Sequence, residues 1–167
     1  MTPNLIRRAA ELSPCGTYRY TLTREWAPAA RPRMLFVMLN PSTADHEQDD
    51  PTIRRCMGFA RREGCGSLEV VNCFAYRSPR PFDLYAAGVF GADIVGPENR
   101  RHVRLAVMRA DIVVCAWGAH GVHLSPVPVL VAEADRWCLG VTKSGAPKHP
   151  LYLRADAPLI RWPVEIP

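Results

Sequence analysis

Three short apolar runs, separated by helix-like segments, constrain the fold of this chain more than any other feature. They are "RMLFVMLN" (33–40), "SLEVVNCFAY" (67–76) and "DIVVCAWG" (111–118). Continuous apolar character over such a length is typical of strands covered on both faces. Strands alternating with helices imply right-handed crossovers and helices on both sides of a sheet. We therefore predict an α/β fold of three layers, α/β/α, around a central, mostly parallel, four-stranded sheet.

The segments around these runs complete the predicted pattern. "DDPTIRRCMGFARREG" has Asp50 as an N-cap, Pro51 at the first helical position and Gly64 as a stop, so it predicts a helix. "YRYTLTREW" alternates large and polar residues and predicts a half-exposed N-terminal strand or hairpin. "CLGVT" (138–142) is the fourth strand of the predicted sheet.

With 167 residues, the chain has the length of one domain with one core. We predict a single domain over 1–167, with an N-terminal extension at 1–33 and an irregular, proline-rich tail at 143–167. No repeat or linker divides it, and a monomer is the default expectation.

Composition narrows the function classes. No segment approaches the roughly 18 apolar residues of a membrane span, and the N-terminus lacks the apolar stretch of a signal peptide, so we expect a cytoplasmic protein without a membrane partner. The six cysteines include no C-x-x-C pair, and neither a metal nor another cofactor is expected. The net charge of +5 is carried mainly by arginine, which suits phosphate contacts but also fits a simple arginine bias.

Ligands of open α/β sheets bind at the carboxyl ends of the strands. In this chain that rule selects four places: the loop at Asn40, the stretch after Asn72, the turn at Trp117 and Gly118, and the loop that holds His149. We predict the functional site there.

The first loop, "LNPSTADHEQDD", is rich in polar groups. Pro41 fixes the chain as it leaves the strand, and the residue before a proline is held extended, so Asn40 is rigidly aimed. Ser42 and Thr43 offer hydroxyls that either bind substrate or cap a turn. Asp45 and Asp49 have no local structural reason and are candidates for a general base, or are solvated loop acids.

Asn72 interrupts a run that should be buried, and a buried amide must find hydrogen-bond partners. It either braces a neighbouring loop or reads a flat polar ligand. Trp117 is either a core residue or a stacking surface, and Gly118 permits the turn.

Four stretches together resemble the motifs of the uracil-DNA glycosylase superfamily in order and spacing, over roughly 34–153: "VMLNPST", "VVNCFAYR", "DIVVCAWGAHG" and "KHPLYL". The wider pattern resembles the bacterial domain-of-unknown-function family 1643, for which no settled activity is known. It consists of "LNPSTAD", "DDPTIRRC", "NCFAYR", "GPEN", "AWGAHG" and "KHPLYL".

The superfamily resemblance implies a glycosylase-like fold and a role for several residues. Asn40 would position the attacking water, with Pro41 as its rigid corner, Asn72 would read the base, and His149 would stabilise the departing base. A base flipped out of a duplex would stack on an aromatic side chain and leave a gap for an apolar wedge. The candidates for these two tasks are Phe74, Tyr76 and Trp117 for stacking, and Leu151 and Tyr152 for the wedge.

Two departures from the superfamily motif concern the pocket. Met38 stands where the superfamily usually has glycine, and Ser42 where it has a small residue or tyrosine. These changes alter the pocket floor and put uracil in doubt as the substrate.

Three functional hypotheses follow from the sequence. The first is a glycosylase-like hydrolase that acts on a base, modified or not, in DNA or a nucleotide. The second is a binding module of the same fold that recognises a nucleotide or single-stranded nucleic acid without chemistry. The third is a Mg²⁺-dependent nucleotide-processing enzyme whose metal would be bound by Asp45, Asp49 and Asp50.

Overall fold

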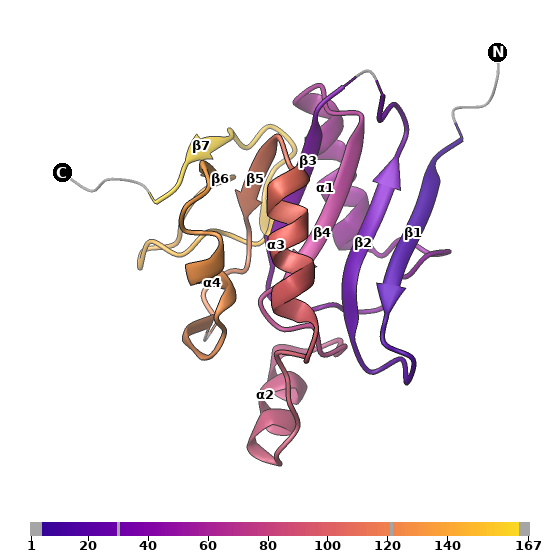
Figure 1. The fold of residues 1–167 in the computed structure, drawn as a ribbon. Coiled ribbons are helices and arrows are strands. Elements are labelled where there is room, and N and C mark those ends of the chain that lie inside the picture. Colours follow the sequence, from indigo (N-terminus) through magenta and orange to yellow (C-terminus); the bar gives the residue numbers. More distant parts are fainter. Residues whose placement is uncertain (1–4, 30, 121, 164–167) are drawn as a thin grey trace.

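One seven-stranded sheet organises the protein, with the strand order β1-β2-β4-β3-β5-β6-β7 (Figure 1). The computed structural model describes residues 5–29, 31–120 and 122–163. The strands are β1 (Arg7–Leu12), β2 (Arg19–Glu25), β3 (Arg33–Met38), β4 (Ser67–Asn72), β5 (Ile112–Cys115), β6 (Arg136–Cys138) and β7 (Ile160–Arg161). The helices are α1 (Pro51–Arg62), α2 (Pro81–Val89), α3 (Asn99–Arg109) and α4 (Val127–Leu130), with short 3₁₀ turns η1 (Val122–Leu124) and η2 (Pro150–Tyr152).

The sheet is mixed, which corrects the predicted four-stranded, mostly parallel sheet. Parallel pairing joins β4 to β3, β3 to β5 and β5 to β6. Antiparallel pairing adds β1 and β2 on one side and β7 on the other. The outermost strands carry little signal in the sequence, because β1 is mostly exposed and charged and β7 has only two residues.

Both faces of the sheet are covered. Alternate residues of β3 point to opposite sides, so Phe36 packs in a core with residues of α1, while Val37 packs in a second core with residues of α3. Figure 1 shows α3 in front of the sheet and α1 behind it. No helix in the described part of the chain is long and apolar enough to cross a membrane.

Helix α1 forms where the sequence predicts it, for the predicted reasons. The Asp50 side chain accepts a hydrogen bond from the Ile53 N–H at 2.8 Å, and Pro51 occupies the first turn. After the helix, Gly64 has a φ of 77°, a left-handed conformation that favours glycine. The chain can then turn back into β4.

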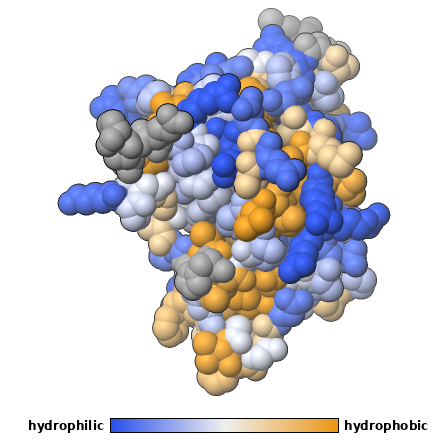
Figure 2. Space-filling view, turned by 60° about the vertical axis from the view of Figure 1, so that its left-hand side comes forward, coloured by the Kyte–Doolittle hydropathy of each residue, from blue (hydrophilic) through white to orange (hydrophobic). Residues whose placement is uncertain are grey.

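Helix α2 projects from the lower end of the molecule in Figure 1. Phe82, Val89 and Phe90 of this region are exposed apolar side chains. Figure 2 shows apolar surface at this lower end of the molecule and more polar surface above it.

Candidate functional site

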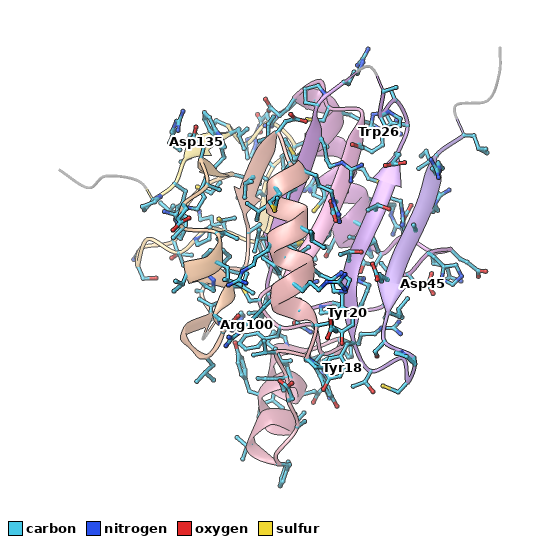
Figure 3. All side chains as sticks on the ribbon, in the orientation of Figure 1. Tyr18, Tyr20, Trp26, Asp45, Arg100 and Asp135 are labelled. Atoms are coloured by element: carbon cyan, nitrogen blue, oxygen red, sulfur yellow. The ribbon has the colours of Figure 1, made fainter. Side chains whose placement is uncertain are left out.

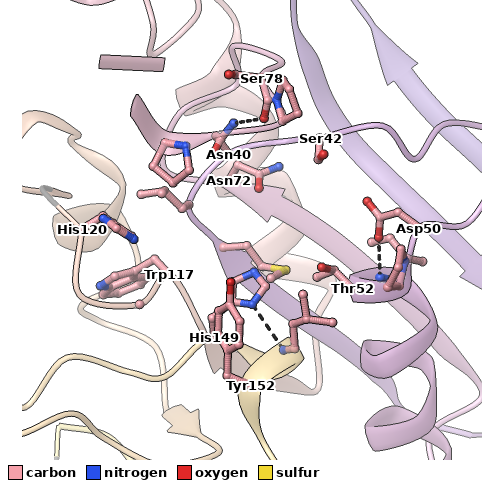
Figure 4. A pocket seen from close by; sticks show the side chains of 18 of the residues that line it. Asn40, Ser42, Asp50, Thr52, Asn72, Ser78, Trp117, His120, His149 and Tyr152 are labelled. Atoms are coloured by element: carbon pink, nitrogen blue, oxygen red, sulfur yellow. Dashed lines mark hydrogen bonds between the residues drawn. The ribbon is translucent and has the colours of Figure 1, made fainter. Parts of the chain in front are cut away.

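A cavity of about 660 Å³ lies at the carboxyl ends of β3, β4 and β5 (Figure 4). Its walls come from the loop after β3, the start of α1, the segments after β4 and β5, and residues 142–152. The residues predicted for the site that line it are Asn40, Ser42, Thr43, Asn72, Trp117, Gly118, His149, Leu151 and the wedge candidate Tyr152. The structure therefore gathers the four predicted places around one cavity.

Asn72, the last residue of β4, is the least satisfied polar side chain of the cavity wall. It is only 1% exposed, and neither Nδ2 nor Oδ1 has a hydrogen-bond partner among the described residues. Leaving a buried amide unpaired costs about 1–3 kcal/mol for each unsatisfied group. The amide thus presents a free donor and a free acceptor to whatever occupies the cavity.

The backbone of β4 is fixed just where Asn72 projects. The carbonyl of Asn72 accepts a hydrogen bond from Asn99 Nδ2 at 3.0 Å. The next carbonyl, of Cys73, accepts one from Ser125 Oγ at 2.6 Å. Asn99 begins α3 and Ser125 precedes α4, so both helices on this face hold the strand end in place.

Asn40 is held by its own amide nitrogen. Nδ2 donates to the carbonyls of Pro41 at 3.1 Å and of Ser78 at 2.9 Å. Because these bonds use the donor side, the amide oxygen remains to accept a hydrogen bond from a ligand or water. Pro41 itself is buried and forms the corner beneath Asn40, outside the cavity wall.

His149 precedes η2 and its ring is oriented by that turn. Nδ1 accepts a hydrogen bond from the Leu151 N–H at 3.3 Å (Figure 4). Burial lowers the pKa of His149; Asp50 opposes this effect and His120 adds to it. The imidazole is therefore neutral at pH 7, with its proton on Nε2, where it can donate a hydrogen bond.

Several residues of the cavity wall had not been predicted from sequence. They include Arg19, His120 and Lys148. Arg19 was overlooked because the alternation in its strand assigned it to a polar, exposed face, yet it is 3% exposed. Asp50 was explained as a helix cap, and it both caps α1 and lines the cavity.

Asp45 and Asp49, the predicted general-base candidates, do not line the cavity. Asp45 Oδ1 accepts hydrogen bonds from the N–H groups of Glu47 and Gln48, both at 2.8 Å, and the bond from Gln48 contributes most to lowering the Asp45 pKa. Asp49 Oδ1 accepts from Arg24 Nε at 2.6 Å. Figure 3 shows Asp45 on the side of the molecule where β1 and β2 lie. Asp45 thus has a local structural role and Asp49 a long-range one, and the sequence revealed neither.

The predicted stacking aromatics are divided. Phe74 is fully buried in the core on the α3 side, and Tyr76 pairs with Tyr18 in an isolated β-bridge, so neither lines the cavity. Trp117 lines it and packs edge-on against Trp162, with ring centroids 5.1 Å apart. Tyr152 lines the cavity and is 84% exposed, which makes it the aromatic most open to a ligand.

The acidic loop does not assemble carboxylates in the way the Mg²⁺ hypothesis requires. Asp45 bonds backbone N–H groups, Asp49 pairs with Arg24, and Asp50 caps α1. No group of three or more His, Cys, Asp or Glu side chains in the described ranges is arranged to hold a metal ion.

A protein-family model described as "Protein of unknown function (DUF1643)" matches residues 19–151. The chain belongs to this family. The matched range includes every cavity segment except Tyr152 at its end. Comparison with curated proteins gives no match, and neither does comparison with solved structures.

Proposed function

We propose that this member of the DUF1643 family is a nucleobase N-glycosylase-like hydrolase, acting on a base, modified or not, in DNA or a nucleotide. The unpaired, buried amide of Asn72 carries the proposal. An amide offers one donor side and one acceptor side, which matches the hydrogen-bonding edge of a nucleobase. A base bound there would satisfy both groups at once.

Asn40 and His149 supply the chemistry of the proposed reaction. The free oxygen of Asn40 holds a water molecule for attack on the sugar carbon. The C–N bond breaks, its electron pair leaves with the base, and the water oxygen forms the new C–O bond while its proton ends on the base. Neutral His149 donates a hydrogen bond to the base as negative charge develops on it. Positioning and electrostatic stabilisation account for the rate.

The motif resemblance supports the same proposal. "LNPST", "NCFAYR" and "KHPLYL", which resemble uracil-DNA glycosylase motifs, contribute Asn40, Asn72 and His149 to the cavity. Met38, which stands in place of the usual glycine, also lines the cavity. This larger side chain favours a substrate other than uracil.

The test is a panel of oligonucleotides, nucleotides and nucleosides carrying normal and modified bases. Released base is measured by chromatography, and abasic sites by alkaline strand cleavage. We expect turnover of at least one substrate, reduced roughly 100-fold or more in Asn72→Ala and His149→Ala, which remove charge-stabilising or base-reading contacts. Lys143→Ala, at an exposed position outside the cavity wall, is the control.

Two outcomes oppose the proposal. If the whole panel stays intact and unbound, the hydrolase proposal fails. If a panel member binds without turnover, and the Asn40→Ala/His149→Ala double variant binds it equally well, the protein is a binding module of this fold.

A further inference from the structure

Arg19 and Arg24 of β2 are buried to a similar degree, but they differ in their hydrogen-bond and ion-pair partners. Arg24 is fully buried and paired: its Nε bonds the Asp49 carboxylate at 2.6 Å, and its other nitrogens bond backbone carbonyls, among them those of Thr23 and Gln48. A buried charge needs such compensation, because removing an ion from water costs several kcal/mol. Arg24 and Asp49 therefore form a structural ion pair in which the buried charge is compensated.

Arg19 lacks this compensation. One nitrogen, Nη1, donates to the Ala44 carbonyl at 2.7 Å, while Nε has no partner among the described residues. No ion pair joins it to a carboxylate in the described part of the chain, although the charges of Asp50 and Asp45 raise its pKa against the effect of burial. Burial lowers the pKa of Arg19 to about 10, so the side chain remains charged at pH 7. Arg19 thus lines the cavity as a buried cation with an unpaired Nε, an arrangement that an anion from outside the chain would complete.

The surroundings of Arg19 in the cavity suit an oxyanion. Pro51 and Thr52 place the N-terminus of the 12-residue helix α1 in the wall, and such an end carries partial positive charge. Ser42 and Thr43 add hydroxyl groups, and exposed Lys148 adds a second cation. Asp50 is the one carboxylate among the described lining residues; it caps α1 through the Ile53 N–H, and its charge partly offsets that of Arg19.

We propose that Arg19, together with the N-terminus of α1, forms a phosphate subsite of this cavity. The phosphate would belong either to a free nucleotide or to a nucleic-acid strand, and guanidinium is the side chain best shaped to bind it. The subsite identifies the ligand of the cavity as a phosphorylated nucleoside. That last step rests on the proposed base-binding role of Asn72, whereas the subsite itself does not.

Binding is measured by isothermal titration calorimetry on the full chain. The probes are inorganic phosphate, the four common deoxynucleosides, their 5′-monophosphates and a short mixed-sequence single-stranded oligonucleotide. We expect at least one phosphorylated probe to bind at least tenfold more tightly than the matching nucleosides, and inorganic phosphate to compete with it. A preference for monophosphates assigns the subsite to free nucleotides, and a preference for the oligonucleotide assigns it to strand phosphates.

The variant Arg19→Met removes the charge and keeps an apolar side chain of similar length. Replacement of a buried charge by an apolar residue is often neutral or stabilising, so we expect the variant to fold. It should lose the phosphate advantage by roughly 10- to 100-fold, the effect of one charge-assisted contact. Arg19→Lys should restore part of it, and Lys148→Ala, at the exposed rim, should cost only a few-fold.

The two proposals can fail separately. Equal binding of nucleosides and phosphorylated probes, or no competition by inorganic phosphate in the parent protein, overturns the subsite even if Arg19→Met does not fold. Arg19-dependent phosphate binding without base release keeps the subsite and removes the hydrolase. Base release without any preference for phosphate keeps the hydrolase and removes the subsite.

Discussion

At the scale of single residues, buried polar side chains in this protein fall into two groups. Glu69, in the centre of the sheet, is fully buried and bonds Arg33 at 3.2 Å and the Nε of Arg109 at 2.9 Å. Of the described side chains with unpaired buried atoms, Asn72 and Arg19 line the cavity, while Tyr85, Asn99 and Arg136 do not. Natural proteins satisfy nearly all buried polar groups, so the two at the cavity are the ones that a bound ligand could satisfy.

The ion pair of Arg24 and Asp49 gives a direct test of a structural role. Asp49→Ala leaves a buried guanidinium without its counter-ion, which should lower the free energy of unfolding by about 3–5 kcal/mol. The exposed pair of Arg80 and Asp83 is the control, and Asp83→Ala should cost less than about 1 kcal/mol. Urea denaturation measures both. An Asp49→Ala protein of parental stability that had lost activity would instead favour Asp49 as a general base.

The cysteines should differ sharply in reactivity. Cys15 is exposed, and hydrogen bonds between its sulfur and the hydroxyls of Ser13 and Thr17 lower its pKa to about 7. Burial raises the pKa of the others, for example of Cys65 to about 11 and of Cys115 to about 12. Since the thiolate is the nucleophile, iodoacetamide at pH 8 should label Cys15 first.

Peptide mass spectrometry locates the label, and Cys15→Ser is the control that should remain largely unmodified in the same time. Labelling of Cys65 or Cys115 at the rate of Cys15 would contradict the burial described above.

The sequence identified the cavity residues that interrupt or end apolar strands, because a polar group in an apolar run is visible in one dimension. Asn40 and Asn72 are of this kind, whereas His149 was selected from its loop and from the motif resemblance of "KHPLYL". Arg19 could not be recognised as a site residue from the sequence. What distinguishes it is an unpaired buried nitrogen, and hydrogen-bond partners come from distant parts of the chain. The structural partner of Asp49 was hidden for the same reason, because Arg24 lies 25 positions away in the chain.

At the scale of elements, those with complete local signals were predicted well. Helix α1 has a cap, a proline, an apolar stripe and a terminating glycine, and it forms within the predicted range. The fourth strand was predicted at 138–142, yet β6 covers Arg136–Cys138 and shares only Cys138 with that range. Strand β4 was predicted to reach Tyr76 and ends at Asn72. These endings depend on contacts with neighbouring elements rather than on local sequence.

Two glycines near α1 should respond to alanine in opposite ways. A Cβ at Gly66 would lie 2.0 Å from the Ala27 carbonyl oxygen. Gly66→Ala therefore forces apart the segment that follows β2 and the segment that precedes β4. A Cβ at Gly58, inside α1, meets nothing within 4 Å. Gly58→Ala should therefore stabilise the protein by about 0.5–1 kcal/mol, while Gly66→Ala should cost several times that amount.

Thermal denaturation of the two variants provides the comparison. A Gly66→Ala melting temperature equal to that of the parent would contradict the packing described. It would mean that the contact between residue 66 and Ala27 can relax at no cost.

At the scale of the whole molecule, the C-terminal region turns back to complete the site. Residues 143–167 were predicted to be an irregular tail, and the described part forms one wall of the cavity and ends in β7. It is fastened from α1, where Arg55 donates to the Leu153 carbonyl at 2.5 Å and Arg62 to the Ala157 carbonyl at 2.6 Å. His149 therefore reaches the cavity only in the completely folded chain.

This dependence on the complete fold makes His149 a reporter of stability against pH. Burial is the main cause that lowers its pKa below the ordinary value of 6.5, so the unfolded chain takes up the proton first as the pH falls. Stability falls with decreasing pH wherever the unfolded state binds more protons than the folded state. If the two states differ by one whole proton, the slope is at most about 1.4 kcal/mol per pH unit. The contribution of His149 is therefore complete above pH 6.5 and is lost progressively below it.

Urea denaturation of the parent and of His149→Gln between pH 8 and pH 5 measures this contribution. At pH 8 the imidazole is neutral in both states, so the difference between the two proteins sets the baseline. We expect the parent to lose stability relative to His149→Gln as the pH drops below about 6.5. Parallel curves over the whole range would mean that the ring is equally hydrated in the folded and unfolded chain, and that the wall formed by residues 142–152 does not enclose it.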